Sequence, residues 1–118
     1  MIEALSVLRS EFDAGDGSFL LQLRCDLHWD QAAFARLTDA MLAYASGRDS
    51  NADIPRWLAE GFWYVDWFVR EWSTHPSFPR EHEQTYYEAA YERLHDLAYF
   101  LFVGESPYND ASALEMPV

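Results

Sequence analysis

The sequence predicts an α+β fold that is mostly helical, with an N-terminal β-hairpin followed by three helices in one compact domain. Three observations lead to this prediction. Between Phe19 and Trp29, apolar residues occupy every second position, which is the period of a half-buried strand. Just before this segment, Asp16 and Gly17 form a dipeptide typical of a two-residue hairpin turn. After it, apolar residues recur at helical spacing in three separate segments.

The predicted hairpin has a definite register. A turn at the Asp-Gly dipeptide places Phe12 opposite Leu21 and Leu8 opposite Cys25, so that the apolar faces of the two strands coincide. Helices must cover that face, because two strands alone are only marginally stable in water. The first strand is the weaker half of the prediction. Four of its apolar residues also have the spacing of a short helix: Ile2, Leu5, Leu8 and Phe12.

The three helices are expected at about residues 30–46, 55–74 and 77–104. Asp30 can cap the first helix by accepting free backbone N–H groups, and Gly47 can end it. Pro55 is suited to open the second helix, since the first turn of a helix does not need its missing N–H. Gly104 is placed to end the third.

We expect residues 1–104 to form the domain and residues 105–118 to form a loosely packed C-terminal tail, because the tail has two prolines and no helical period. Half of all residues are hydrophobic and 17% are aromatic, which suits a core rich in rings. The single cysteine, Cys25, is expected to be a small buried apolar residue. No apolar run has the length of a membrane span and no signal-peptide pattern opens the chain, so we expect a cytoplasmic protein.

The charge of the chain excludes several function classes. There are 20 acidic and 8 basic residues, a formal net charge of −12, and all the basic residues are arginine. Without lysine, Schiff-base chemistry, pyridoxal phosphate chemistry and a P-loop lysine are excluded. The acidity also argues against nucleic acid and anionic membranes as partners, and favours a basic protein. Lysine-poor acidity is also typical of GC-rich genomes and salt-adapted hosts, so it can be a trait of the whole host.

The second helix has the most unusual composition. Its wide apolar face includes Phe62 and Phe68, while Trp63 and Trp67 lie among charged residues. Exposed tryptophan beside arginine is typical of a binding hot spot. A helix that is apolar nearly all round is more often the central helix of its domain, with every side covered. The sequence favours this second interpretation, in which both tryptophans are covered, and leaves their exposure open.

The third helix carries a polar stripe that includes Glu88, Glu92, His95 and Tyr99. Glu92 and His95 have the Glu-x-x-His spacing of carboxylate-bridged di-iron bundles, but the chain has no second copy of that motif. A homodimer would supply one. The stripe lies opposite the apolar residues of the same helix, so a solvated face is the favoured interpretation, and no cofactor or metal is expected.

Three functions remain open on the sequence alone. The first is a non-catalytic, acidic protein-binding module that docks on a basic partner protein. Bacterial immunity proteins and antitoxins share this profile, and the likeness is one of composition alone. Its expected partner-binding residues are Glu60, Trp63, Asp66, Trp67, Arg70, Glu88 and Glu92. The alternatives are a homo-oligomeric structural or adaptor protein with an aromatic helix interface, and a small ligand- or metal-binding domain that uses Glu88, Glu92 and His95. No catalytic residue is predicted.

Overall fold

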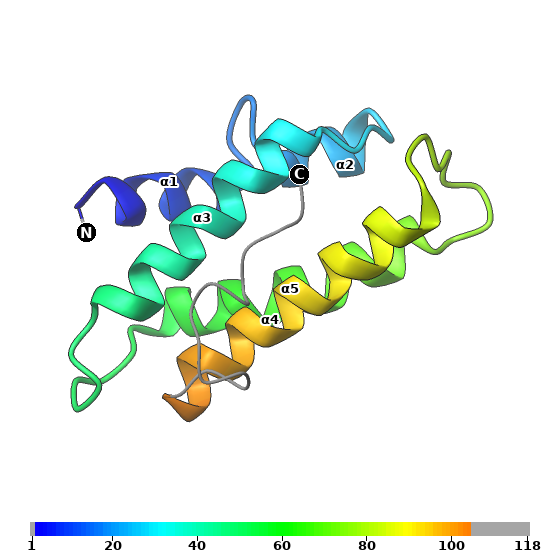
Figure 1. Ribbon diagram of the computed structural model, residues 1–118. Helices are drawn as coiled ribbons and strands as arrows, with labels where there is room; N and C mark the ends of the chain where they lie inside the picture. Colours follow the sequence, from blue (N-terminus) through cyan, green and yellow to red (C-terminus); the bar gives the residue numbers. More distant parts are fainter. Residues whose placement is uncertain (1, 105–118) are drawn as a thin grey trace.

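The computed structural model describes residues 2–104, and in this range the chain is all-helical, without a strand (Figure 1). The five helices are α1 (Ile2–Phe12), α2 (Phe19–Cys25), α3 (Gln31–Gly47), α4 (Arg56–Ser73) and α5 (Gln84–Val103). Helix α1 packs against α3, α4 packs against α5, and contacts between α3 and α5 join the two pairs. The short α2 packs mainly against α4. The expected tail, residues 105–118, lies outside the described residues.

The predicted β-hairpin, and with it the α+β fold class, is wrong, because both expected strands are helices. Phe19, Leu20 and Leu23 are buried together in α2, and their spacing is that of one helical face. Leu20 is the apolar residue that interrupts the alternating pattern. Ser18 begins the helix by accepting the backbone N–H of Leu21 at 3.1 Å, which is an N-cap and has no counterpart in a hairpin.

Helix α1 is the helical alternative that the spacing of its apolar residues allowed. It buries Ala4, Leu8 and Glu11, which lie one turn apart on the same face. Gly17 does adopt the left-handed backbone conformation expected of a turn residue, with φ 78°. The turn joins two helices, however, and Cys25 at the end of α2 is exposed instead of buried.

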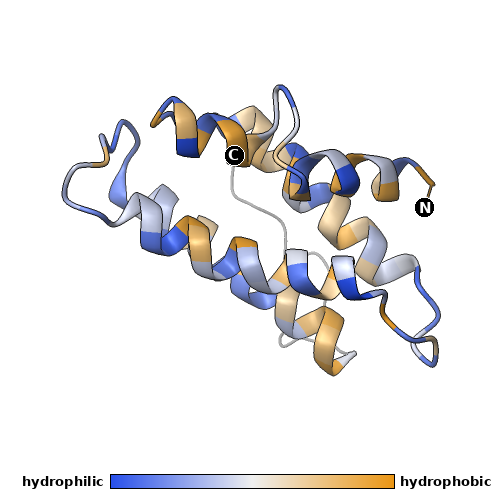
Figure 2. Ribbon diagram, turned by 180° about the vertical axis from the view of Figure 1, so that it is seen from behind, coloured by the Kyte–Doolittle hydropathy of each residue, from blue (hydrophilic) through white to orange (hydrophobic). Residues whose placement is uncertain are grey.

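The three later helices are confirmed, with one shifted boundary. Asp30 caps α3 by accepting the N–H groups of Ala32 and Ala33 at 3.0 and 3.1 Å, and Gly104 ends α5 with φ 86°. Helix α5 begins at Gln84, later than expected. Figure 2 shows that hydrophobic and hydrophilic residues share every helix, and no helix within residues 2–104 is long and apolar enough to cross a membrane.

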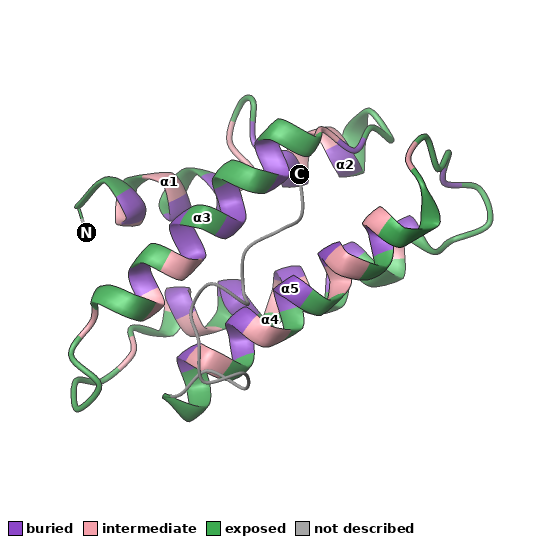
Figure 3. Cartoon of the chain, in the orientation of Figure 1, coloured by how far each residue is buried: buried purple, intermediate pink, exposed green. Residues whose placement is uncertain are grey.

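Trp29, in the loop between α2 and α3, lies at the centre of an aromatic core. Its ring is 2% exposed and meets Phe19 of α2 edge-on, with ring centroids 4.9 Å apart, and Phe34 of α3 at 5.2 Å. Tyr87 of α5 packs edge-on against it at 5.1 Å, and Nε1 of Trp29 donates to Oη of Tyr86 at 3.0 Å. One side chain therefore joins three helices. Figure 3 shows the buried residues on the inward faces of the helices.

Helices α1 and α4 approach each other closely at a glycine. Gly61 is buried in α4, and the ring of Phe12, at the end of α1, lies directly over it. A Cβ added at Gly61 would be 2.2 Å from Cδ2 of Phe12, which is far inside van der Waals contact. The ring of Phe12 also meets Phe62 and Trp57 edge-on, so it cannot move aside without losing these contacts.

We therefore expect Gly61→Ala to destabilise the fold by about 1–3 kcal/mol, the usual cost of overpacking a core, although alanine is the better helix former. The double variant Gly61→Ala with Phe12→Leu should recover part of that loss, because the smaller side chain makes room. Urea unfolding of both variants measures the difference. A fully additive pair of effects would contradict the proposed contact.

A buried carboxylate holds α1, α2 and α3 together. Glu11 is 2% exposed, and its Oε2 accepts the backbone N–H of Phe19 at 2.9 Å. Its Oε1 lies 3.8 Å from Nη2 of Arg36, in α3. Burial raises the pKa of the Glu11 carboxyl above its ordinary value of 4.5, while the N–H of Phe19 and the charge of Arg36 act in the opposite direction.

Glu11→Gln should change how stability depends on pH. A carboxyl with a raised pKa holds its proton more tightly in the folded chain, so its stabilising contribution is full below pH 4.5 and is lost as the pH rises through the raised pKa. The glutamine variant stays neutral. Its free energy of unfolding, relative to the wild type, should therefore increase as the pH rises above 4.5, as measured by urea unfolding over a pH series.

Asp30 provides a control of opposite sign. The N–H of Ala33 lowers the pKa of the Asp30 carboxyl below 3.8, so its stabilising contribution is full above pH 3.8 and is lost as the pH falls through the lowered pKa. The stability difference between Asp30→Asn and the wild type should thus change only in acid, below pH 3.8. The same pH trend in both variants would show that these two carboxyls are wrongly assigned.

Candidate protein-interaction face

The exposed side of α4 forms the most distinctive surface of the described chain. We call it the α4 stripe, and its members are all exposed: Arg56, Glu60, Trp63, Trp67, Arg70 and Thr74, which is the residue that caps the end of the helix. Trp63 is 58% exposed and Trp67 is 50% exposed, so the favoured interpretation, a central helix with every side covered, is wrong. Helix α4 is covered by α1, α2 and α5 on its inner side only, which leaves the side that faces the viewer in Figure 2 open to solvent.

The two tryptophans of the stripe lie against each other. Their ring centroids are 5.9 Å apart and their planes differ by 3°, a stacked arrangement that a spacing of one helical turn allows. Tyr64 packs against Trp67 at 6.1 Å, and its Oη accepts a hydrogen bond from Nη2 of Arg24, in α2, at 2.6 Å. Tyr64 thus supports the tryptophan pair from one side, and the pair presents two broad apolar rings to solvent.

Charged residues border the tryptophans on the side of α5. Asp66 Oδ2 lies 3.3 Å from Nδ1 of His95, and Asp66 Oδ1 lies 3.9 Å from Nη2 of Arg70. The guanidinium of Arg70 lies over the ring of Tyr91, 5.7 Å from its centroid. These contacts fix the register of the antiparallel pair α4 and α5, with Asp66 level with His95.

The structure brings together most of the residues predicted to bind a partner. Four of them belong to the α4 stripe, and Asp66 flanks it. Glu88 and Glu92 are exposed on α5 but lie two turns and one turn before His95, respectively, beyond the Arg70 end of the tryptophan pair. They therefore extend the face along α5 without touching the aromatic part.

The polar stripe of α5 does not form a metal site in the described chain. Within residues 2–104, no group of three or more His, Cys, Asp or Glu side chains is close enough to hold a metal ion. His95 contacts Asp66, and Glu88 accepts a hydrogen bond from Nε2 of Gln84 at 3.3 Å. Neither contact resembles a ligand shell for iron or zinc.

Two features of the surface were missed from the sequence. Arg56 and Thr74 complete the α4 stripe, and their signal in the sequence is the alternating spacing of four and three residues. The second feature is a mainly apolar hollow of about 220 Å³ at the C-terminal end of α4, lined by Leu27, Trp72, His75, Ser77 and Phe78. Few polar groups converge there, so the hollow offers little chemistry for a specific ligand.

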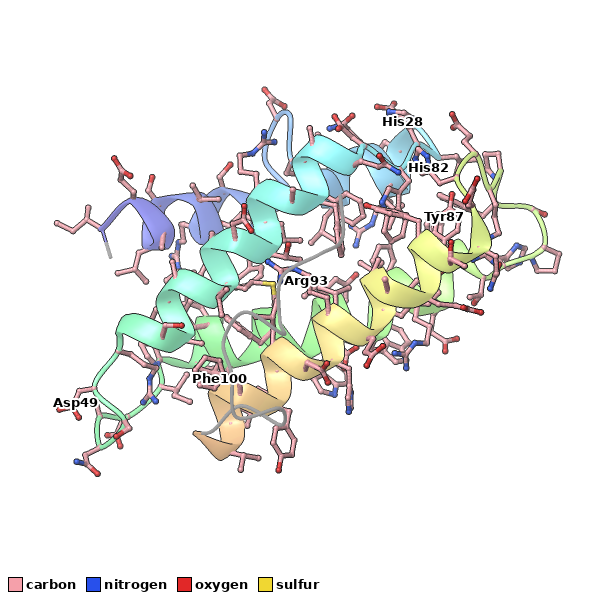
Figure 4. The ribbon with its side chains drawn as sticks, in the orientation of Figure 1. His28, Asp49, His82, Tyr87, Arg93 and Phe100 are labelled. Carbon is pink, nitrogen blue, oxygen red and sulfur yellow. The ribbon has the colours of Figure 1, made fainter. Side chains whose placement is uncertain are left out.

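His82 packs beside the aromatic core. Nε2 of His82 lies 2.9 Å from the carbonyl oxygen of Trp29, and its backbone N–H donates to Oη of Tyr87 at 3.2 Å. Figure 4 shows His82 and Tyr87 together, near His28, where the loop before α3 meets the start of α5. His82 is thus part of the packing around the aromatic core.

The exposed and buried tryptophans should respond very differently to substitution. Trp63→Ala and Trp67→Ala are expected to change the free energy of unfolding by no more than about 0.5 kcal/mol at low protein concentration, since neither side chain fills the core. Trp29→Ala should cost about 3–5 kcal/mol, because it leaves a cavity among three helices. Chemical unfolding followed by circular dichroism measures all three; a large loss at Trp63 or Trp67 would place those rings in the core.

No protein-family model, curated protein or solved structure matches this chain. Its function is therefore inferred from the chemistry and geometry of its own surface. That surface has two distinct parts: an aromatic stripe on α4, and exposed carboxylates that continue along α5.

Proposed function

We propose that this chain is a non-catalytic protein-binding module whose acidic surface docks on a basic partner protein, in the manner of a small immunity protein or antitoxin. The observation that carries the protein-binding role is the exposed, stacked pair Trp63 and Trp67. Tryptophan is costly to leave in water and is enriched at the centres of protein interfaces, so two such rings side by side support a protein-contact role.

The charge of the chain supports the choice of partner. A net charge of −12 on 118 residues creates a field that attracts a basic surface and speeds its encounter with the module. Glu88 and Glu92 are exposed beside the aromatic face and are the carboxylates best placed to meet basic residues. In contrast, no lysine is present and the arginines are few, which gives little basis for binding nucleic acid.

The test is binding of an identified basic protein, for which the product of a neighbouring gene is the first candidate. Its Kd for the wild type should rise as salt is added, because screening weakens attraction between opposite charges. Glu88→Gln with Glu92→Gln should weaken binding and make it less sensitive to salt. Isothermal titration at several salt concentrations measures both effects.

The matched control is Asp49→Asn with Asp53→Asn, in the loop between α3 and α4. Figure 4 shows Asp49 at the opposite end of the molecule from His28. This pair removes the same charge, so it should lower the salt sensitivity only slightly and leave the Kd nearly unchanged. Equal losses from the two double variants, or a Kd that does not depend on salt, would contradict the proposed docking surface.

A second candidate function is a homo-oligomeric adaptor, and one specific observation favours it. Trp63 and Trp67 occupy neighbouring a and d positions on the exposed face of α4, where a helix that pairs with another helix carries its apolar residues. The two functions are compatible, because the stripe and the carboxylates of α5 are different parts of the surface.

A further inference from the structure

Helix α4 has two faces that serve different purposes. Its inner face buries seven residues in the chain's own core: Leu58, Gly61, Phe62, Val65, Phe68, Val69 and Ser73. Its outer face, the α4 stripe, has the a and d spacing of a coiled-coil heptad through its whole length. The positions that a coiled coil would turn to solvent are here packed against α1, α2 and α5. Within the described chain, Trp63 and Trp67 of the stripe stay exposed, whereas Arg70 contacts Tyr91 of α5.

The order of residues along the stripe is self-complementary. If two copies of α4 pair in antiparallel fashion about a twofold axis at Val65, each a position faces a d position of the other copy. Trp63 then packs against Trp67 of the second copy, and Trp67 against Trp63. One layer further out on each side, Glu60 faces Arg70 of the second copy, which is a pair of opposite charges.

The local charge of the stripe suits a second copy better than it suits a basic protein. The whole chain has a net charge of −12, but the stripe contains Arg56 and Arg70 beside Glu60, with Glu71 adjacent. It is therefore close to neutral where two copies would meet. Most other acidic groups lie outside it, and at physiological ionic strength charges further apart than about 8 Å are largely screened.

The contacts of Asp66 reduce the one repulsion that the pairing introduces. Asp66 flanks the stripe near the proposed axis. In the dimer, the Asp66 carboxylates of the two copies would therefore lie along the same edge of the interface. Each carboxylate already has His95 at 3.3 Å and Arg70 at 3.9 Å within its own chain. These cationic or polar neighbours offset the like charge before the second copy arrives.

We propose that the α4 stripe binds a second copy of this chain, forming an antiparallel α4–α4 dimer with Trp63 and Trp67 at its centre. This dimer rests on the proposed function in one respect, namely that this face binds protein. It adds that the bound protein is a second copy of the chain. The dimer leaves Glu88 and Glu92 of both copies exposed. A basic partner then meets these carboxylates, while the tryptophans are buried between the copies.

Charge reversal tests the register directly. Glu60→Arg places two arginines opposite each other in both outer layers, and Arg70→Glu places two glutamates there, so each single variant should weaken dimerisation roughly tenfold or more. The double variant Glu60→Arg with Arg70→Glu restores both pairs and should dimerise more tightly than the Arg70→Glu single variant. It should stay weaker than the wild type, because it lacks the Arg70 guanidinium that neighbours Asp66. Analytical ultracentrifugation over a concentration series measures each Kd.

The two single variants also separate specific pairing from net charge. Glu60→Arg changes the net charge from −12 to −10 and Arg70→Glu changes it to −14, so general repulsion alone would strengthen one dimer and weaken the other. The proposed pairing weakens both. Mixing the two variants should produce a heterodimer, because an arginine of one chain then faces a glutamate of the other in each layer; native mass spectrometry detects it.

Several results would overturn the dimer. A wild type that stays monomeric at every concentration ends it, as does a dimer whose Kd neither single variant changes, since the interface would then lie elsewhere. Loss of dimer in the double variant without a heterodimer from the mixture also contradicts the register, and circular dichroism shows whether each variant is folded. If a wild-type monomer binds a basic protein, the proposed function stands and the dimer fails. If the wild type dimerises but shows no salt-dependent binding through Glu88 and Glu92, the dimer stands and the proposed function fails.

Discussion

The packing around Trp29 is the interaction on which the rest of this structure depends. The indole stands in a loop, yet it is buried among rings from α2, α3 and α5, and its Nε1 donates to Tyr86. Its own backbone carbonyl oxygen lies 2.9 Å from Nε2 of His82, so the chain before α5 is held at the same point. This joins the N-terminal helices to the last helix across a long separation in sequence. Helix α4 then packs against this assembly from one side.

The one-sided position of α4 explains why the chain has an aromatic surface at all. A helix in the middle of a bundle would bury Trp63 and Trp67, whereas a helix at the edge must leave one stripe open. Here the inner face is made of small and apolar residues, including Gly61, which lets the ring of Phe12 approach closely. The stripe is locally neutral and aromatic, while the surface beyond it is strongly acidic. One helix therefore contributes to the core and separates two chemically different surfaces.

Most of the helical content from Asp30 onward could be predicted, because caps, glycine ends and helical periodicity are local signals. The hairpin was mispredicted for a local reason as well. Alternating apolar residues and a turn dipeptide outweighed Leu20 and the capping residue Ser18, although a seven-residue helix needs little more than a cap and one buried face. The candidate site was predicted in its residues but not in its exposure. The burial of a ring is not a property of its own helix; it depends on which neighbours cover it.

The sequence by itself determined the charge of this protein, the absence of lysine chemistry, the limits of the helices expected at residues 30–46 and 55–74, and the pairing of tryptophan with charge on α4. Only the tertiary structure decided that α1 and α2 are helices packed on the core, that Trp29 is buried, and that Trp63 and Trp67 are exposed. The physical reason is that capping, charge and periodicity act over a few residues, whereas burial is a competition among all apolar faces for a limited core. Trp29 is buried among three helices, whereas the outer side of α4 stays exposed.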